Sequence, residues 1–470
     1  MYFCLLFVIS RWTGRRATNE TFYRGGRRSP WYMVAFGMIG ASISGVTFVS
    51  VPGMVTRIDM TYLQTCLGFI VGYVLVAFVL LPLYYRLNLT SIYAYLGQRL
   101  GQHSYKTGAS FFLLSKMTGA AVRFYVVCII LQRFVFDTLG TPFFLTVLGM
   151  VVLIWLYTRQ GGIRTLVFTD VLQTICLFTA LLLIIWQVVG DLGMTWNEVC
   201  STVANDPKSR VFVFDDWVSK QNFWKQFLSG IFIVIVMTGL DQDMMQKNLT
   251  CKSMRDAQKN MCTYGVMFVP ANLLFLTLGV LLTQWYASFG VQQPVVGDDL
   301  LPAYVSHSSQ LVLALFTLGI VAASFSSADS ALTALTTSFC VDICQRQGDE
   351  RLRKWVHVGM AVVFAVFILL FRVLNSTSII DAIYILCSYT YGPLLGLFAY
   401  GLLTKRQTND RLVPYICVIS PIFCYILDCL VGRYTGYHFG YELLMLNGVL
   451  TFIALLIAQN TRTAERPSLF

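Results

Sequence analysis

The sequence predicts an all-α protein that crosses a membrane many times. Only 12% of its 470 residues are charged and its mean hydropathy is +0.66, whereas soluble domains are about 25% charged. Apolar stretches of about 20 residues, the length that a bilayer-spanning helix needs, recur along the whole chain. Lys and Arg concentrate in alternate loops between these stretches, as is typical of polytopic membrane proteins.

We expect about 12 complete membrane spans, preceded by a partial helix. The partial helix, MYFCLLFVIS at residues 1–10, is too short to cross a bilayer and lacks the basic region and cleavage site of a signal peptide. We therefore interpret it as a truncated first helix. The complete spans are expected at residues 31–55, 63–85, 107–136, 142–158, 165–190, 224–246, 262–286, 306–340, 355–374, 378–403, 412–430 and 440–460.

The positive charges predict the orientation of these spans. Most of the 34 Lys and Arg residues lie in loops on the same side as residues 11–30, and cytoplasmic loops are enriched in basic residues. The longest loop, 191–223, is then expected on the outer side. The net charge of +11 follows from this orientation and needs no nucleic-acid partner.

The order of the spans predicts two inverted repeats. Five spans begin on the inner side and the next five begin on the outer side, because five is an odd number; many transporters are built this way. The expected parts are a truncated first helix with a cytoplasmic basic loop (1–30), a first five-helix repeat (31–190), an extracytoplasmic loop (191–223), a second repeat (224–403), and additional C-terminal helices with a short tail (404–470).

The first helix of each such repeat is broken near the middle of the membrane, where it exposes backbone oxygens. In span 31–55, Gly37, Gly40 and Gly45 lie around Ser42 and Ser44. These glycines indicate either a break or close packing between helices through small residues.

The partner span, 224–246, has Thr238 and Gly239 ahead of two carboxylates. The matching positions of the two glycine-containing segments favour a break in both. Asp241 and Asp243 lie near the inner end and are followed by Lys247, so we interpret them as ion pairs of a gate or loop.

An oxygen-rich face is expected in the segment SFSSADSALTALTTSF, residues 324–339. Helical spacing of three and four residues places these side chains on one face: Ser326, Asp329, Ser330, Thr333 and Thr337. Serines in a span often bond only to the carbonyl four residues earlier. A row of hydroxyls with a carboxylate instead indicates a site for a hard cation, which prefers oxygen ligands.

Another ionisable group, Asp170, lies with Thr169 and Gln173 near the inner end of its span. Ionisable residues in a span are costly and mostly face a cavity or a partner. Asp170 is therefore either a functional carboxylate or part of an interfacial cap.

Lys116 and Arg123 lie seven residues apart, on one face of a helix. Arg123 lies deeper and either grips a substrate carboxylate through its planar fork or pairs with a buried Asp. Lys116 is expected to extend toward the cytoplasmic surface. Thr47 and Gln64 are uncharged polar groups that either line a cavity or pack without a function.

Three segments resemble the sodium/solute symporter family, which includes the sodium–glucose, sodium–proline and sodium–sialic acid symporters. They are FYRGGRRSPWYMVAFGMIGASISGVTFVSVPG, GGIRTLVFTDVLQ and AASFSSADSALTALTTSFCVDI. The resemblance runs from about Thr21 to about Leu403. It implies a LeuT-like five-plus-five inverted repeat and sodium-coupled import of a small organic solute across a plasma membrane, here a bacterial inner membrane. It implies neither an enzyme nor an obligate protein partner.

The resemblance also implies a main sodium site made from two elements. The backbone carbonyls of Gly40 and Ile43 at the first break would be ligands. The carbonyl of Ala323 and the hydroxyls of Ser326 and Ser327 would complete the site.

Some members resemble this chain in having a second cation site near the Asp of the TDxxQ motif. In this sequence that Asp is Asp170, with Ser330 as a further ligand. Asp329 stands where several members have a small or hydroxyl residue. Asp329 therefore either tunes this site, carries a proton or pairs with Arg123.

The resemblance implies substrate contacts at Thr47, Gln64, Arg123 and Met237. Sugar-transporting relatives have an amide and an aromatic residue where this chain has Val234 and Met237, which argues against a glucose-like substrate. An arginine in the helix of Arg123 grips a carboxylate in sialic acid symporters, so an organic anion is the expected substrate.

Two alternatives remain for the function. Proton coupling through Asp170 or Asp329 would give a proton-coupled permease of the same fold. Some relatives carry a signalling domain after the transport helices, which gives a transporter-like membrane sensor, although this chain ends at Phe470, soon after its last span. A membrane enzyme is disfavoured, because HExxH and GxSxG motifs are absent from the sequence.

Overall fold

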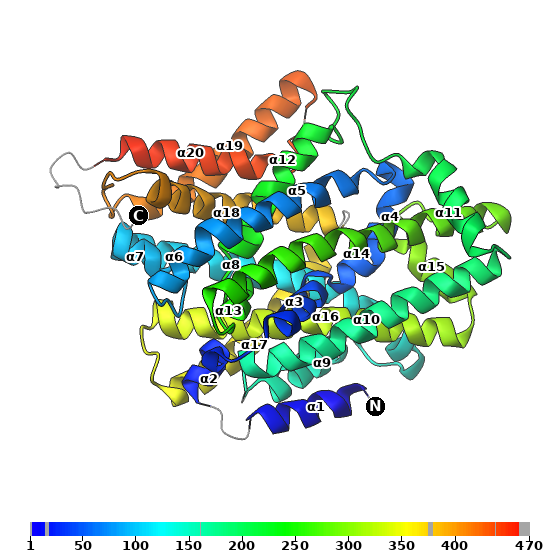
Figure 1. Ribbon diagram of the computed structural model, residues 1–470, viewed down its shortest axis with the longest axis horizontal. Coiled ribbons are helices and arrows are strands. Elements are labelled where there is room, and N and C mark those ends of the chain that lie inside the picture. Colours follow the sequence, from blue (N-terminus) through cyan, green and yellow to red (C-terminus); the bar gives the residue numbers. More distant parts are fainter. Residues whose placement is uncertain (1, 15–17, 160, 375–378, 438, 460–470) are drawn as a thin grey trace.

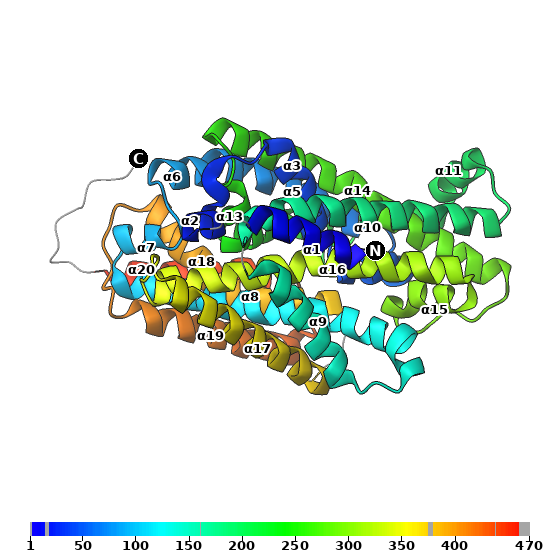
Figure 2. The ribbon, with the colours of Figure 1, turned by 90° about the horizontal axis from the view of Figure 1, so that it is seen from below.

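The computed structural model describes residues 2–14, 18–159, 161–374, 379–437 and 439–459. The described part of the chain is almost entirely helical. Its long helices run along the long axis of the molecule in both Figure 1 and Figure 2. The tail expected after the last span lies outside the described residues.

Helices occur at every position where the sequence predicts a span. Those of the first half are α1 (Tyr2–Thr13), α2 (Asn19–Arg24), α3 (Trp31–Ser42), α4 (Gly45–Ile58), α5 (Tyr62–Leu75), α6 (Leu81–Arg86), α7 (Ala94–Arg99), α8 (Gln102–Leu131), α9 (Phe143–Thr158), α10 (Ile163–Asp191) and α11 (Trp196–Asn205). Those of the second half are α12 (Phe223–Val234), α13 (Gln242–Asn248), α14 (Met254–Ser288), α15 (Leu300–His307), α16 (Gln310–Ser338), α17 (Glu350–Leu374), α18 (Ile379–Leu403), α19 (Val413–Thr435) and α20 (Leu443–Ile457).

The lengths of these helices fit a membrane protein. Among the described residues, eight helices are long and apolar enough to cross a bilayer, or ten if each bent pair forms one span. Helices α1, α9 and α20 are apolar but shorter. The partial first helix, α1, packs against the bundle: Ser10 Oγ donates to the Tyr157 carbonyl at 2.5 Å, and the hydroxyls of Thr13 and Thr165 are 2.7 Å apart.

Both predicted breaks are confirmed. The axes of α3 and α4 differ by 61°, with Ile43 and Ser44 between them. The second bend is 71°, between Phe223–Gly239 and α13. There the Asp241 side chain accepts hydrogen bonds from the backbone N–H groups of Asp243 and Met244, at 2.9 and 3.4 Å, which caps the start of α13.

The helices around the first break form the centre of the bundle. Helix α16 packs along α10 and α8, while α10 also packs against α3 and α14 packs against α4. Helices α19 and α20 pack against α18 at the edge of the molecule (Figure 1). The α3–α4 break is therefore enclosed by helices from both halves of the chain.

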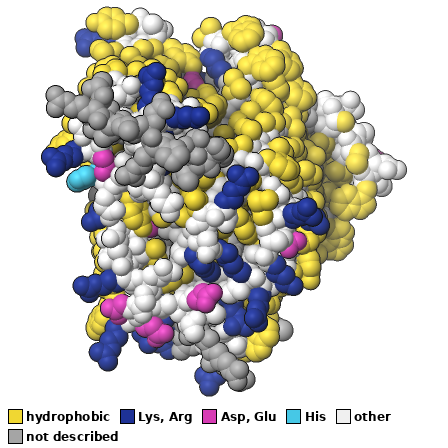
Figure 3. Space-filling model, turned by 60° about the vertical axis from the view of Figure 1, so that its left-hand side comes forward, with side chains coloured by type: hydrophobic (Ala, Val, Ile, Leu, Met, Phe, Trp, Pro, Cys, Tyr) yellow, Lys and Arg dark blue, Asp and Glu magenta, His cyan; other side chains and the backbone are white. Residues whose placement is uncertain are grey.

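The two ends of the bundle differ in charge. Helices α2, α6 and α7 lie at one end, whereas α11 and α15 lie at the other (Figure 2). Figure 3 shows that Lys and Arg side chains gather on the end with α2, α6 and α7. This distribution agrees with the orientation expected from the loops, in which 191–223 lies outside.

Candidate functional site

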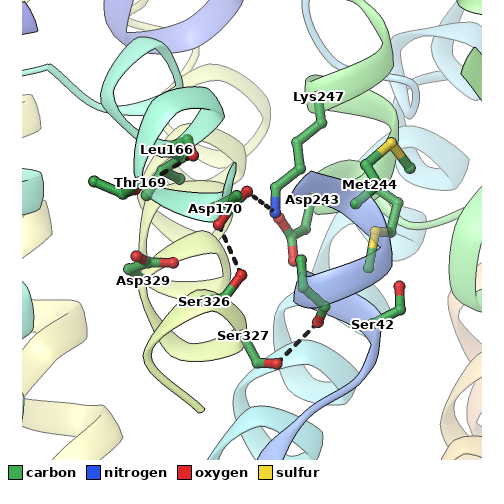
Figure 4. Close-up of polar contacts among 12 residues, drawn as sticks. Ser42, Leu166, Thr169, Asp170, Asp243, Met244, Lys247, Ser326, Ser327 and Asp329 are labelled. Carbon is green, nitrogen blue, oxygen red and sulfur yellow. Dashed lines mark hydrogen bonds and ion pairs between the residues drawn. The ribbon is translucent and has the colours of Figure 1, made fainter. Parts of the chain in front are cut away.

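The α3–α4 break faces two adjacent serines of α16. Ser327 Oγ donates a hydrogen bond to the Ala41 carbonyl oxygen at 2.9 Å and lies 3.4 Å from the Ala323 carbonyl (Figure 4). Carbonyls in the last turn of a helix lack intrahelical partners, so the end of α3 has oxygens available here. Hydroxyl and carbonyl oxygens from two elements thus meet at one place.

Two glycines bring the backbone of the break close to its neighbours. A Cβ atom at Gly40 would lie 2.0 Å from Thr174 Oγ1 of α10, and one at Gly45 would lie 2.1 Å from Ser324 Oγ of α16. No side chain fits at either position without a shift. The break therefore lies directly against both helices, and Ile43 between the two glycines is fully buried.

Asp170 of α10 joins this region from the other side. Its Oδ1 accepts a hydrogen bond from Ser326 Oγ at 2.7 Å, and its Oδ2 forms an ion pair with Lys247 Nζ at 2.7 Å. Gln173, with its amide oriented to satisfy its contacts, also donates to Asp170 Oδ1 at 3.3 Å. Asp170 is therefore a buried functional carboxylate in geometry, and not an interfacial cap. The sequence indicated Asp170 but missed Lys247 as its partner.

Asp329 points toward a different neighbour. It is fully buried, and its Oδ2 accepts a hydrogen bond from the Tyr157 hydroxyl at 2.6 Å. The expected pairing with Arg123 was wrong, because Tyr157 of α9 lies beside this face of α16. Asp329 Oδ1 and Ser330 Oγ are buried without a hydrogen-bond partner among the described residues.

A cavity lies where the two broken helices approach each other. Ser42 of α3 lines it, together with Met237 and Asp241 from the second break. Helix α8 contributes Lys116 and Arg123, and aromatic side chains complete the wall: Phe69, Tyr73, Tyr264, Phe268 and Tyr391. The cavity thus has apolar and aromatic walls with a few charged groups, as solute sites do.

Lys116 does not extend to the cytoplasmic surface, and that prediction was wrong. Its ammonium is buried and lies 2.7 Å from Asp243 Oδ2 and 3.2 Å from Asp241 Oδ2. Tyr391 donates a further hydrogen bond to Asp241 at 2.6 Å. The two carboxylates do form ion pairs, as predicted, but the lysine comes from α8, because the second break lies beside that helix.

Arg123 differs from Lys116 in having no fixed partner. Its side chain is half-buried and lines the cavity. Among the described residues, no carboxylate lies within ion-pair distance of its guanidinium. The guanidinium is therefore available to a solute in the cavity.

The other two uncharged candidates, Gln64 and Thr47, do not line this cavity. Gln64 is fully buried; its amide donates to the Gln221 carbonyl at 2.9 Å and accepts from the Val213 N–H at 3.1 Å. It therefore holds the loop before α12. The sequence analysis missed Tyr264, whose hydroxyl hydrogen-bonds with Ser42 and Tyr73, because single aromatic residues in a span carry no pattern.

Comparisons with known proteins agree with this architecture. The model of the sodium:solute symporter family matches residues 22–411. The sodium/sialic acid symporter NanT of Aliivibrio fischeri is 25% identical over 427 residues, covering 87% of this chain and 82% of that protein. The mouse sodium-coupled monocarboxylate transporter 2 is 24% identical over 433 residues, covering 85% and 67%.

Solved structures show the same fold. A Na⁺-coupled sialic acid symporter in a substrate-bound outward-open state superposes with a TM-score of 0.85 at 22% identity, covering 100% of this chain and 98% of the other. The nucleobase-cation-symport-1 family transporter Mhp1 in a closed conformation gives a TM-score of 0.60 at 15% identity, covering 94% of each chain. The transporter fold predicted from the sequence is thus confirmed.

Proposed function

This chain belongs to the sodium:solute symporter family and is a sodium-coupled membrane transporter, and from this we propose that it imports a small organic anion. Sodium, the co-transported ion, binds between the α3–α4 break and α16. The anion binds in the cavity between the two breaks. The transporter lies in a plasma membrane, that of a bacterial inner membrane.

The proposed sodium ligands are the carbonyl oxygens of Gly40, Ile43 and Ala323 and the hydroxyls of Ser326 and Ser327. The contact of Ser327 with the end of α3, at 2.9 Å, supports this set, because it places oxygens of both elements in one position. Sodium is a hard cation and prefers such ligands. The Asp170 carboxylate behind Ser326 makes the surrounding potential more favourable for a cation.

Arg123 is the observation that carries the proposal of an anionic substrate. The charge of Lys116 is balanced by Asp241 and Asp243, whereas Arg123 lines the cavity without an ion-pair partner among the described residues. A guanidinium binds a carboxylate through two parallel hydrogen bonds. The relatives named for sialic acid and for monocarboxylates support a carboxylate as the group that Arg123 binds.

The breaks give this arrangement a way to move. Sodium bound at the first break ties α3 and α4 to α16, and a solute in the cavity contacts both broken helices. In transporters with broken helices, alternating access is largely a rocking of one helix bundle against the other around a fixed site. The two ligands together therefore favour closure of the cavity toward the outer side.

A screen of the purified protein tests the proposal. Thermal unfolding would be measured with sugars, amino acids and carboxylates, each with and without sodium. We expect a carboxylate to raise the melting temperature only when sodium is present. We expect Arg123→Met to abolish this shift and Arg133→Met, which removes an exposed arginine beyond the end of α8, to preserve it. Stabilisation by a neutral sugar that survives in Arg123→Met would overturn the proposed substrate class.

A further inference from the structure

Lys247 is a buried lysine that the proposed binding of sodium and anion does not use. Its side chain is 1% exposed, and every residue of α13, on which it lies, is buried. It stands in the last turn of that helix, where the helix dipole favours a positive charge. A buried ammonium is costly unless a counter-charge compensates it, so its partner is an essential part of the fold.

That partner, Asp170, has both carboxylate oxygens occupied. Ser326 of α16 donates to Oδ1 at 2.7 Å, and Lys247 Nζ lies 2.7 Å from Oδ2. Figure 4 shows Asp170 between these two side chains, with Lys247 reaching it from α13. The negative charge of Asp170 is therefore already matched by a positive charge of the same chain.

A mobile cation at Asp170 would have to share this carboxylate with the ammonium. Two positive charges a few ångströms apart repel strongly where water is excluded. The ammonium is covalently part of α13, so it is not diluted into solution when the cavity opens. A free sodium ion is consequently disfavoured at Asp170 but not at the Ser327 side of the break, where carbonyl and hydroxyl oxygens carry no bound cation.

We propose that Lys247 takes the place of a second transported cation at Asp170, so that each chain binds one sodium ion. The position of that ion at Ser326 and Ser327 rests on the proposed function. Asp170 then acts as a fixed, neutralised support for the Ser326 hydroxyl. The second cation site suggested by the sequence is filled by a side chain.

Direct binding of radioactive sodium to the purified full-length protein tests this inference without knowledge of the solute. We expect the wild type to bind one sodium per chain with hyperbolic saturation. We expect Lys247→Met to free Asp170 and to raise the number of bound ions to two, and the double variant Lys247→Met/Asp170→Asn to return to one. Lys252→Met removes an exposed lysine five residues further on and should leave the number at one.

Each other result decides against the inference. Two ions bound to the wild type, or one ion bound to a folded Lys247→Met protein, would overturn it. If Lys247→Met does not fold, the charge-balanced double variant decides: one bound ion supports the inference, and loss of sodium binding contradicts it. One ion that persists in Ser326→Ala/Ser327→Ala would instead overturn the proposed sodium site and leave the stoichiometry standing.

Discussion

The hydroxyl of Ser326 donates a hydrogen bond to Asp170 at 2.7 Å, which links α16 to α10. The next residue, Ser327, turns the other way and donates to the Ala41 carbonyl of α3 at 2.9 Å. Two adjacent hydroxyls therefore join three elements at one point. A ligand at this point bridges the broken helix and α16.

We expect Ser326→Ala and Ser327→Ala each to weaken sodium binding by about tenfold to a hundredfold. The reason is that a polar contact to a charged group contributes roughly 1.5–3 kcal/mol. The dissociation constant from sodium titration of the purified protein measures this effect. Thr333→Val is the matched control, since Thr333 Oγ1 is buried without a described partner and lies outside the proposed ligand set; equal losses in all three variants would contradict the assignment.

Lys116→Met should strongly destabilise the protein. Removing one member of a buried ion pair costs roughly 3–5 kcal/mol, because the partner charge stays buried and uncompensated. Lys116 neutralises Asp243 at 2.7 Å, so the double variant Lys116→Met/Asp243→Asn should be more stable than Lys116→Met alone. Melting temperatures of the wild type, both single variants and the double variant measure this coupling. Additive losses would show that the pair does not stabilise the second break.

Gly45→Ala should disturb the contact between α4 and α16. The added methyl group would lie 2.1 Å from Ser324 Oγ, and overpacking of this kind costs roughly 1–3 kcal/mol. Ser324→Ala removes the opposing oxygen, which has no described hydrogen-bond partner. We therefore expect Ser324→Ala to be nearly neutral by itself and to restore much of the thermal stability lost in Gly45→Ala. Failure of this rescue would place the obstruction elsewhere.

Gln64→Leu distinguishes a loop anchor from a substrate contact. The change leaves the Val213 N–H and the Gln221 carbonyl without their partner, and each unsatisfied buried group costs roughly 1–3 kcal/mol. We expect faster limited proteolysis between residues 206 and 222 and unchanged carboxylate-induced stabilisation. Loss of that stabilisation with normal proteolysis would instead assign Gln64 to the substrate. Thr47→Val, on half-buried Thr47, serves as the control within the same bundle.

Much of the fold was predictable because it follows from local chemistry. Apolar length located the spans, and small residues around Gly40 and Gly45 indicated the first break, where the backbone lies against α10 and α16. The oxygen-rich face of α16 followed from helical spacing. These features depend on residues that are close together in the sequence.

The ion pairs could not be predicted in the same way. Lys116 and Asp241 are 125 residues apart, and their contact depends on which helices become neighbours after folding. The position of Lys116 near a helix end suggested exposure, but the second break fills that end with carboxylates. For Lys247, the nearest carboxylates in sequence were Asp241 and Asp243, whereas its partner lies on α10.

The Lys247–Asp170 pair also sets a limit on what the transporter can accumulate. One sodium ion imported with one monovalent anion moves no net charge, so a membrane potential, worth about 2.3 kcal/mol per elementary charge at 100 mV, does no work on the imported pair. The inside-to-outside ratio of the anion can then rise only to the outside-to-inside ratio of sodium. A tenfold sodium gradient supports at most about tenfold accumulation, and the stored energy in that gradient is about 1.4 kcal/mol. A buried lysine thereby makes uptake electroneutral and readily reversible when sodium outside falls.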